Sequence, residues 1–295
     1  MKILLTGANG QLGNLLREQV PVGVELVALN SQQLDIGNGE QVRAVVSQVQ
    51  PAIIINAAAY TAVDKAESEQ EAAWRVNEQG VANLVAATNA ATRILHVSTD
   101  FVFDGRQTQP YKTDAATNPL SVYGKSKRGG ELVLVNSAAD RSCIVRTAWL
   151  YSAGSKNFMN TMLTLMQTRE KLRVVSDQRG TPTSAQGLAT ALWRLVQLPA
   201  VKGILHWTDD DETTWHGFAS EIQRLGLHYG LLHKVVPIEP IATSEFPTPA
   251  TRPAYSVLDK ESTFAALGIR AQPWQQALEQ VIARKASEAA AGKQH

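Results

Sequence analysis

The stretch Lys2-Ile3-Leu4-Leu5-Thr6-Gly7-Ala8-Asn9-Gly10-Gln11-Leu12-Gly13 decides the fold of this chain. Its apolar start predicts a buried strand, and the glycines at 7, 10 and 13 follow directly, where a helix is expected to begin. Glycine permits a tight turn and lets the main chain approach a pyrophosphate at the helix amino terminus, where unpaired N–H groups point outward. The G-x-x-G-x-x-G spacing therefore predicts a dinucleotide-binding turn. The alternative is that Gly13 only allows the helix to pack closely on the strand.

The same alternation of strand and helix continues to about residue 150. Short apolar runs predict strands at Lys2–Thr6, Val24–Leu29, Ala52–Ile55, Ile94–Ser98 and Ser142–Thr147. Helical spacing falls between them, at Gln11–Val20, Gly39–Gln50, Ser68–Ala91 and Ser121–Ala138. Such βαβ units predict an α/β fold with a Rossmann-type, doubly wound parallel sheet. We expect residues 1–150 to form the dinucleotide-binding domain.

Residues 151–295 predict a smaller, mixed α/β substrate-binding region, some of whose segments return to the first sheet. Helices are expected at Asn157–Thr168, Ser184–Leu198, Thr214–Gly226, Asp259–Leu267 and Gln272–Lys285, and strands at Leu172–Ser176, Gly203–Trp207 and Lys234–Ile238. Five prolines between Pro237 and Pro253 predict a long loop without regular structure. The small and polar segment Ser287–His295 predicts a frayed tail.

Composition excludes several classes of protein. The 295 residues include 28 lysines and arginines and 27 acids, so the net charge of +1 argues against a nucleic-acid binder with a basic face. Cys143 is the only cysteine, which excludes an internal disulfide framework and a cysteine-based zinc site. No apolar stretch reaches the 18 or so residues that a membrane helix needs. These features predict a cytoplasmic protein with no membrane or nucleic-acid partner.

Tyr123 and Lys127 stand four residues apart at the start of a predicted helix and therefore share one of its faces. A free phenol has a pKa near 10, and a nearby ammonium is expected to move that pKa toward the working range of an acid–base catalyst. Thr99 lies at the carboxyl end of the fourth strand, where open α/β sheets bind ligands. Its hydroxyl is expected to bind a carbonyl oxygen that Tyr123 protonates. A Y-x-x-x-K pair alone commonly arises by chance on an exposed helix face. Together with the glycine turn and Thr99 at the end of the fourth strand, it predicts a dehydrogenase.

The end of the second strand bears on the choice of cofactor. Asn30-Ser31 stands where many dehydrogenases carry an acid that binds the ribose hydroxyls. Asn30 would not repel a 2′-phosphate, and no arginine stands beside it to attract one. NADPH and NADH are both permitted, with a slight preference for NADPH.

These motifs resemble those of the extended short-chain dehydrogenases/reductases, and more closely the dTDP-4-dehydrorhamnose reductases. The resemblance extends over essentially the whole chain. It is carried by Asn56-Ala57-Ala58-Ala59, Thr61-Ala62-Val63-Asp64-Lys65-Ala66-Glu67, Ser98-Thr99-Asp100-Phe101-Val102-Phe103-Asp104-Gly105, Arg146-Thr147-Ala148-Trp149-Leu150-Tyr151, Asp177-Gln178-Arg179-Gly180-Thr181-Pro182-Thr183 and Arg252-Pro253. Two departures stand out: Phe101 occupies a position where tyrosine is frequent, and Asn30 replaces an acid that some members carry.

The resemblance implies reduction of the C4 keto group of dTDP-4-dehydro-β-L-rhamnose by NAD(P)H, in the biosynthesis of dTDP-rhamnose for cell-surface polysaccharides such as the lipopolysaccharide O-antigen. Tyr123 would donate the proton, Thr99 would bind the oxygen and Lys127 would tune Tyr123 and hold the ribose. Asp100 and Trp149 match positions that contact the sugar nucleotide. Positions that match cofactor contacts are, beside the turn residues Gly7, Gly10 and Gly13, Gln11, Leu12, Asn30, Asp35, Ile36, Ala59, Tyr60 and Thr61.

Two further substrate contacts are expected. Arg252 follows the proline-rich loop and could close over a diphosphate, unless it is an ordinary surface residue. Asn157 could contact the sugar or simply cap a helix. His96, in the middle of a strand, is predicted to be a satisfied core residue and not a base.

Other readings of the sequence remain open. Some relatives of this kind pair through magnesium and carboxylates, so a homodimer is conceivable, but the sequence assigns no magnesium ligands. The rival functions are another nucleotide-sugar enzyme of the superfamily, either an epimerase or a dehydratase, and a non-catalytic regulatory subunit with the same fold. Dehydratases of this type typically carry Asp-Glu after the catalytic threonine, whereas Asp100 is followed here by Phe101.

Overall fold

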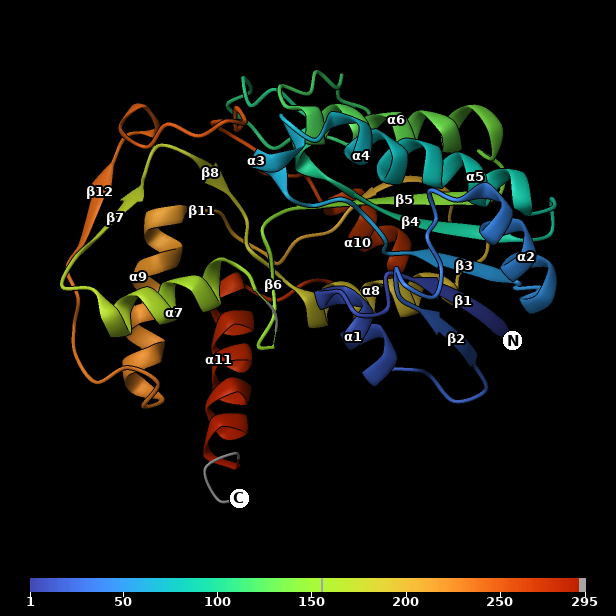
Figure 1. The fold of residues 1–295 in the computed structure, drawn as a ribbon. Coiled ribbons are helices and arrows are strands. Elements are labelled where there is room, and N and C mark those ends of the chain that lie inside the picture. Colours follow the sequence, from blue (N-terminus) through green and yellow to red (C-terminus); the bar gives the residue numbers. More distant parts are fainter. Residues whose placement is uncertain (155, 292–295) are drawn as a thin grey trace.

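The computed structural model of the protein describes residues 1–154 and 156–291 (Figure 1). Its centre is a six-stranded sheet in the order β10-β5-β4-β3-β1-β2, in which every neighbouring pair is parallel. The strands are β1 (Lys2–Thr6), β2 (Glu25–Leu29), β3 (Ile53–Asn56), β4 (Arg93–Thr99), β5 (Ser142–Thr147) and β10 (Gly203–His206). Strands β3 and β5 are buried along their whole length, because helices cover both faces of the sheet. The predicted α/β fold with a parallel sheet is confirmed.

Three helices pack on each face of the sheet (Figure 1). One face is covered by α1 (Gln11–Glu18), α8 (Ala185–Val196) and α10 (Glu261–Leu267), which share a core with β1, β3, β5 and β10. The other face is covered by α2 (Gly39–Val49), α5 (Gly80–Ala87) and α6 (Val122–Ser137). The chain adds β2 on one side of β1 and β3 on the other, so α1 and α2 lie on opposite faces and the strand order reverses between β1 and β3. Open sheets of this kind bind ligands at such a reversal, beyond the carboxyl ends of the strands.

A second core lies beside the sheet and is built from residues after 150. Its helices are α7 (Phe158–Thr168), α9 (Trp215–His228) and α11 (Trp274–Ala291), with the parallel pair β7 (Leu172–Val175) and β12 (Ile238–Ile241) (Figure 1). Shorter pairs join β6 (Leu150–Tyr151) to β9 (Thr183–Ser184), and β8 (Arg179–Gly180) to β11 (Thr213–Thr214). The same part of the chain also sends β10, α8 and α10 to the first sheet. We retain the division at residue 150 as a proposal.

The expected strand at Lys234–Ile238 and the irregular loop from Pro237 to Pro253 are both wrong in part. The strand is β12, shifted to Ile238–Ile241, and a 3₁₀ turn follows at Thr243–Glu245. Pro240 lies inside β12, opposite Val174 of β7. A proline lacks only its own N–H donor, so it is tolerated in a two-stranded pair whose outer edge needs no partner.

The single helix expected at Ser68–Ala91 is divided. It comprises α4 (Gln70–Trp74), a π-helical segment η1 (Arg75–Gln79) and α5, and a separate short helix α3 (Val63–Ala66) precedes it. A π turn inserts an extra residue and turns a side chain aside, frequently at a functional site. Here the buried Asn77 of η1 holds the loop after β3, since its side chain bonds the main chain of Tyr60 and the Ser126 hydroxyl of α6.

The carboxyl end differs from the expected frayed tail. Helix α11 continues through Ser287 to Ala291, because Val281 and Ile282 anchor it in the second core, and residues 292–295 lie outside the described residues. Across the part of the chain that the structure describes, no helix combines the length and the apolar character needed to cross a membrane.

Gly13→Ala and Gly10→Ala test the packing of the turn. A Cβ at Gly13 would lie 2.3 Å from the carbonyl oxygen of Gly7 and 2.7 Å from main-chain atoms of Ala8, whereas one at Gly10 would lie 3.3 Å from its nearest neighbour. We expect Gly13→Ala to lower the free energy of unfolding by about 1–3 kcal/mol or more, as overpacking does. Gly10→Ala should cost about 1 kcal/mol or less, because it causes no severe overlap with the main chain and loses only the preference for glycine over alanine at a helix N-cap. Urea unfolding of both variants measures the difference, and equal losses would contradict the close packing at Gly13.

Candidate active site

The glycine turn occupies the carboxyl edge of β1. Gly7 has a φ of +73°, and a Cβ there would lie 2.7 Å from the main chain of Ala57 after β3. The conformation and the close approach both demand glycine. Gly10 is the N-cap of α1 and makes no side-chain cap, so the first N–H groups of this helix remain open to a ligand. This is the geometry that binds an anion such as a pyrophosphate.

Of the other predicted cofactor residues, Gln11 makes side-chain hydrogen bonds, whereas Leu12 and Ile36 are buried. The Gln11 amide oxygen accepts hydrogen bonds from Ser152 (3.0 Å) and Asn157 (2.9 Å), which links α1 to the segment after β6. The side chains of Leu12 and Ile36 are buried in the core, so only their main-chain atoms are free to contact a cofactor.

Polar and loop residues complete the predicted cofactor set. Asn30 forms a turn in which its side chain accepts the N–H groups of Gln32 and Gln33. Asp35 pairs with Arg75 of η1, an arginine that the sequence near Asn30 does not reveal. The half-buried Ala59 and Tyr60 and the exposed Thr61 form the loop after β3 that Asn77 anchors.

Thr99 ends β4 and is buried beside Asp100. Its hydroxyl accepts the N–H of Phe101, which caps the 3₁₀ turn η2 (Asp100–Val102), and it donates to the Asp100 carboxylate at 3.0 Å. Burial raises the pKa of Asp100 to about 6, while hydrogen bonds from Ser256 and Thr99 act in the opposite direction. Thr99 and Asp100 are therefore fixed next to each other at the carboxyl edge.

Tyr123 lies in the first turn of α6, whose N-cap Ser121 accepts the N–H of Gly124. Its ring meets that of Phe101 edge-on, with centroids 5.5 Å apart. Gly124 allows this approach, because a Cβ there would lie 2.2 Å from the Phe101 carbonyl oxygen. Phe101 therefore contacts Tyr123 through its ring.

The pKa of Tyr123 is raised in this structure, and Lys127 is not among the groups that act on it. Burial raises the pKa of Tyr123 to about 12; a hydrogen bond with Thr99 lowers it, and the nearby Asp100 charge raises it further. Lys127 does not offset this, because its ammonium group points into the sheet, where Nζ donates to the Val97 carbonyl oxygen at 2.7 Å. Tyr123 is consequently held as a neutral phenol, the protonated form that a proton donor requires.

Lys127 is almost completely buried, at 2% exposure. Burial lowers its pKa to about 8, and the charge of Glu131 acts in the opposite direction. Its Nζ also lies 3.3 Å from Nε2 of His96. His96 is fully buried and bonds Asn56 through Nδ1, so its prediction as a satisfied core residue is confirmed.

A buried ion pair supports this edge from below. Glu131 of α6 binds Arg146 of β5 through two bonds of 2.8 Å, and both side chains are at most 1% exposed. Glu131 also accepts from Ser98 of β4 (2.6 Å) and from Arg128 (2.9 Å). Burial opposes the ionisation of Glu131, but these partners hold its pKa below the usual range. The pair fixes α6 against β4 and β5.

Trp149 follows β5 in a strained conformation, with φ of +47°. Its indole stacks on that of Trp215, with centroids 3.5 Å apart and planes 11° apart, and covers Gly180. Trp215 is only partly buried and packs against the second core, whereas Trp193, Trp207 and Trp274 are buried. The two indoles form a flat aromatic platform at the start of the second region.

Asn157 and Arg252 are both engaged within the chain. Asn157 caps α7, where its side chain accepts the N–H of Asn160, and it donates to Gln11. Arg252 pairs with Asp64 of α3 at 2.7 Å and donates to the Thr248 hydroxyl. Their contacts with substrate stay predictions.

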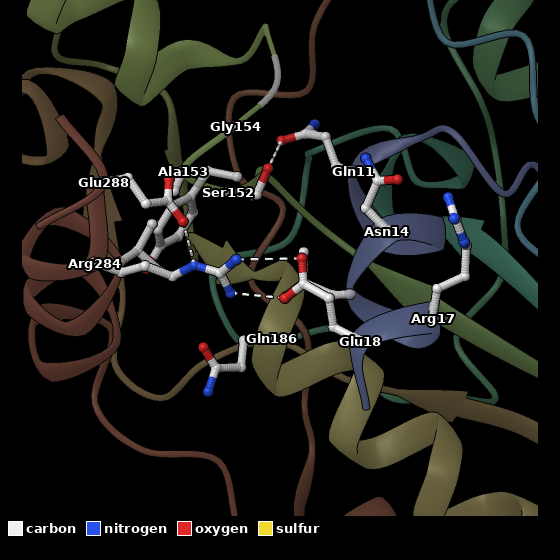
Figure 2. Close-up of a pocket in the computed structure, with 13 residues that line it drawn as sticks. Gln11, Asn14, Arg17, Glu18, Ser152, Ala153, Gly154, Gln186, Arg284 and Glu288 are labelled. Carbon is white, nitrogen blue, oxygen red and sulfur yellow. Dashed lines mark hydrogen bonds and ion pairs between the residues drawn. The ribbon is translucent and has the colours of Figure 1, made fainter. Parts of the chain in front are cut away.

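A pocket of about 400 Å³ separates α1 from α11 (Figure 2). Arg284 crosses it between Glu18 and Glu288, and Gln11 and Ser152 meet at its edge (Figure 2). Tyr123, Lys127 and Thr99 do not line it, so it is not the place where these three converge. Within residues 1–154 and 156–291, no group of three or more His, Cys, Asp or Glu side chains could hold a metal ion, and we assign no magnesium site there.

Comparison with known proteins decides the family. The family model described as the RmlD substrate binding domain matches residues 1–287. The chain belongs to this family. It is 40% identical over 289 residues to a dTDP-4-dehydrorhamnose reductase of Burkholderia thailandensis, which covers 94% of this chain and 97% of that protein.

Solved structures of family members agree. The dTDP-4-dehydrorhamnose reductase of Clostridium acetobutylicum superposes with a TM-score of 0.90 at 39% identity, covering 96% of this chain and 98% of the other. The Bacillus anthracis enzyme of the same name, solved in complex with NADP, gives 0.89 at 33% identity, covering 96% and 99%.

Several residues that build the site escape prediction from the sequence. Asn77 and Glu131 carry no motif that marks them as partners of the predicted site, whereas Asn56 stands in the segment Asn56-Ala57-Ala58-Ala59 but is not itself predicted as a site residue. Asn56 ends β3 at the carboxyl edge of the sheet, which is a usable signal, whereas the role of Glu131 emerges only from its contact with Arg146.

Proposed function

We propose that this protein reduces the C4 keto group of dTDP-4-dehydro-β-L-rhamnose to give dTDP-L-rhamnose, with NADPH or NADH as the reductant. The observation that carries the proposal is that Thr99, at the carboxyl end of β4, lies beside Tyr123 in the first turn of α6, in a chain of this family. A cytoplasmic location fits this activity. A homodimer stays a prediction.

The turn after β1 fits a nicotinamide dinucleotide. A Cβ at Gly7 or Gly13 would occupy the cradle between β1, α1 and the loop after β3, and the open N–H groups of α1 suit a pyrophosphate. When bound, the cofactor would supply the hydride for C4 of the sugar. Gln11 and the loop at Ala59, Tyr60 and Thr61 would hold it, and Lys127 would hold its ribose. Asn30 carries no charge to oppose a 2′-phosphate, so a preference for NADPH is part of the proposal.

Tyr123 would deliver the proton to the oxygen on C4. Burial keeps the phenol protonated at neutral pH, and the Thr99 hydroxyl lies beside it to bind the same oxygen. Together, Tyr123 and Thr99 would hold the sugar carbonyl against the Tyr123 hydroxyl, which lowers the cost of orientation. Asp100 would bind a sugar hydroxyl, and Trp149 would pack on an apolar face of the sugar nucleotide.

A direct assay tests this function. Purified protein is mixed with dTDP-4-dehydro-6-deoxy sugar, and oxidation of NADPH and of NADH is followed by absorbance, with and without magnesium. We expect turnover with release of oxidised cofactor in each cycle. A dinucleotide that stays tightly bound in stoichiometric amount, with no net oxidation, would instead favour the epimerase or dehydratase alternative. Absence of turnover together with intact nucleotide binding would favour a regulatory subunit.

The pH dependence of this activity follows from two buried groups. The pKa of Lys127 is lowered to about 8 and that of Tyr123 is raised to about 12, so Lys127 is the group that loses its proton between pH 7 and 9.5. We expect kcat/KM for the sugar to fall as the pH rises through about 8, because the ammonium group proposed to hold the ribose loses its charge. Initial rates from pH 6.5 to 9.5 measure the fall, and a flat profile would contradict it.

A further inference from the structure

Lys127 lies against a chain of buried polar groups that the proposed reaction does not use. Beside its bond to the Val97 carbonyl oxygen, its Nζ lies 3.3 Å from Nε2 of the His96 ring. The far side of the same ring contacts Asn56, whose Nδ2 lies 3.0 Å from His96 Nδ1. His96 is fully buried and Asn56 is 1% exposed, so water does not compete for these contacts.

The orientation of the Asn56 amide is determined by its other neighbours. Its Oδ1 accepts the Thr6 hydroxyl at 2.7 Å and the main-chain N–H of Ala58 at 3.3 Å. A main-chain N–H can only donate, so the oxygen of Asn56 must face Ala58. The amide nitrogen therefore faces His96, to which it can only donate.

This orientation selects one tautomer of His96. Burial and the charge of Lys127 lower the pKa of His96 well below 6.5, so its ring is neutral and carries one proton. Because Nδ1 accepts from Asn56, the proton lies on Nε2 and points at Lys127. A neutral amine at Lys127 accepts this bond, whereas an ammonium group has no acceptor lone pair to offer.

Other charged groups near Lys127 come from the elements packed on α6. Glu131, one turn further along the helix, favours the ammonium form, but it is already bonded to Arg146, Arg128 and Ser98. From η2, Asp100 acts on Tyr123. Among the titratable groups of residues 1–154 and 156–291, only His96 lies within hydrogen-bond distance of Nζ in an orientation that opposes the charged form.

We propose that His96 is a positioning residue for Lys127: its Nε2–H, oriented by Asn56 and Thr6, favours the neutral amine and so makes the proton of Lys127 easy to release. The part that His96 would play in catalysis rests on the proposed function. A lysine that holds its proton weakly at neutral pH can return a proton to the site after Tyr123 has given one up. The Ala58 N–H, which donates to Asn56, belongs to the loop after β3 that is expected to bind the cofactor. This loop therefore also helps to orient His96.

The first test measures the tautomer in the unmodified protein. Protein labelled with ¹⁵N on histidine is examined by NMR at pH 9.5, above the pKa of Lys127, with His96→Phe used to assign the His96 signals. The proposal expects the proton on Nε2. A proton on Nδ1 would overturn it, because the ring would then accept from Lys127.

The second test reverses the direction of the hydrogen bonds that join residue 56, His96 and Lys127. Asn56→Asp keeps the size of the side chain but replaces the donor by a carboxylate oxygen, which draws the His96 proton to Nδ1 and leaves Nε2 free to accept from Lys127. We expect the proton affinity of Lys127 to rise about tenfold or more, which is one pKa unit. The measurement is a pH titration of ¹³Cε-labelled lysine signals, with the Lys127 signal assigned by Lys127→Met, and the alkaline limb of the activity profile should move upward with it.

A double variant separates the hydrogen-bond chain from the added charge. In a His96→Phe background, Asn56→Asp should raise the Lys127 pKa by less than half as much, because only the direct charge effect remains. Asn83→Asp, which adds a carboxylate to the other side of α5, controls for distant charge and should leave the Lys127 pKa unchanged. Equal rises with and without His96, or no rise in either, would overturn the proposal. Both titrations need no substrate, so they remain decisive if the reductase assay fails.

Discussion

Tyr123→Phe is expected to lower kcat for the keto sugar by about 10²–10⁴-fold, the usual contribution of a positioned proton donor. The variant removes one hydroxyl and leaves the ring, so the edge-on contact with Phe101 and the capped first turn of α6 persist. The dissociation constant for NADPH and the unfolding midpoint should stay close to those of the parent protein. Stopped-flow absorbance at a saturating concentration of NADPH measures the rate, and tryptophan fluorescence measures the binding.

Tyr229→Phe is the matched control for Tyr123→Phe. The Tyr229 hydroxyl donates to Glu279 near the surface of the second region, far from the carboxyl edge of the sheet. Its loss should change kcat by less than about twofold, as for a surface substitution of small energetic effect. If Tyr123→Phe reduced the sugar as fast as the parent protein, the proton donor would have to be another group.

Arg146→Met is expected to have the largest effect on stability, a loss of about 3–5 kcal/mol, because it leaves Glu131 buried without its main partner. Arg146 is 1% exposed, binds Glu131 through two bonds and lies over the ring of Phe103. Arg128 and Ser98 remain as partners of Glu131 but do not replace a bidentate guanidinium. Urea unfolding followed by circular dichroism measures the change.

Two comparisons isolate the unpaired charge as the cause. Glu131→Leu combined with Arg146→Met should be more stable than Arg146→Met alone, because removing both charges costs less than leaving one buried. Arg284→Met breaks a pair with Glu18 in which both side chains are more than 40% exposed, and it should cost less than about 1 kcal/mol. A loss below about 1 kcal/mol for Arg146→Met as well would contradict the structural role of the buried pair.

Helices and strands with a clear local pattern could be predicted from the sequence. Strands β1 and β5 begin and end where the apolar runs do, and α6 and α7 begin one residue after the polar side chains that cap them. The secondary structure of the proline-rich segment from Pro237 to Pro253 could not be predicted from local pattern, because Pro240 lies in a strand that forms through its pairing with β7. The π turn at Asn77 likewise arises from contacts with Tyr60 and Ser126, which lie 17 and 49 residues away.

The predicted site divides in the same way. Glycine spacing, the Y-x-x-x-K pair and Thr99 at a strand end are local features, so the class of fold could be predicted from them, and they also suffice to propose the cofactor turn and the three central residues. Only the tertiary structure decided the protonation of these groups and their neighbours, because a pKa depends on burial and on partners distant in the chain. Lys127 turns toward His96 and away from the phenol of Tyr123, and Arg252 pairs with Asp64 across 188 residues. No local pattern of residues encodes such contacts, which form when the sheet brings its strands side by side.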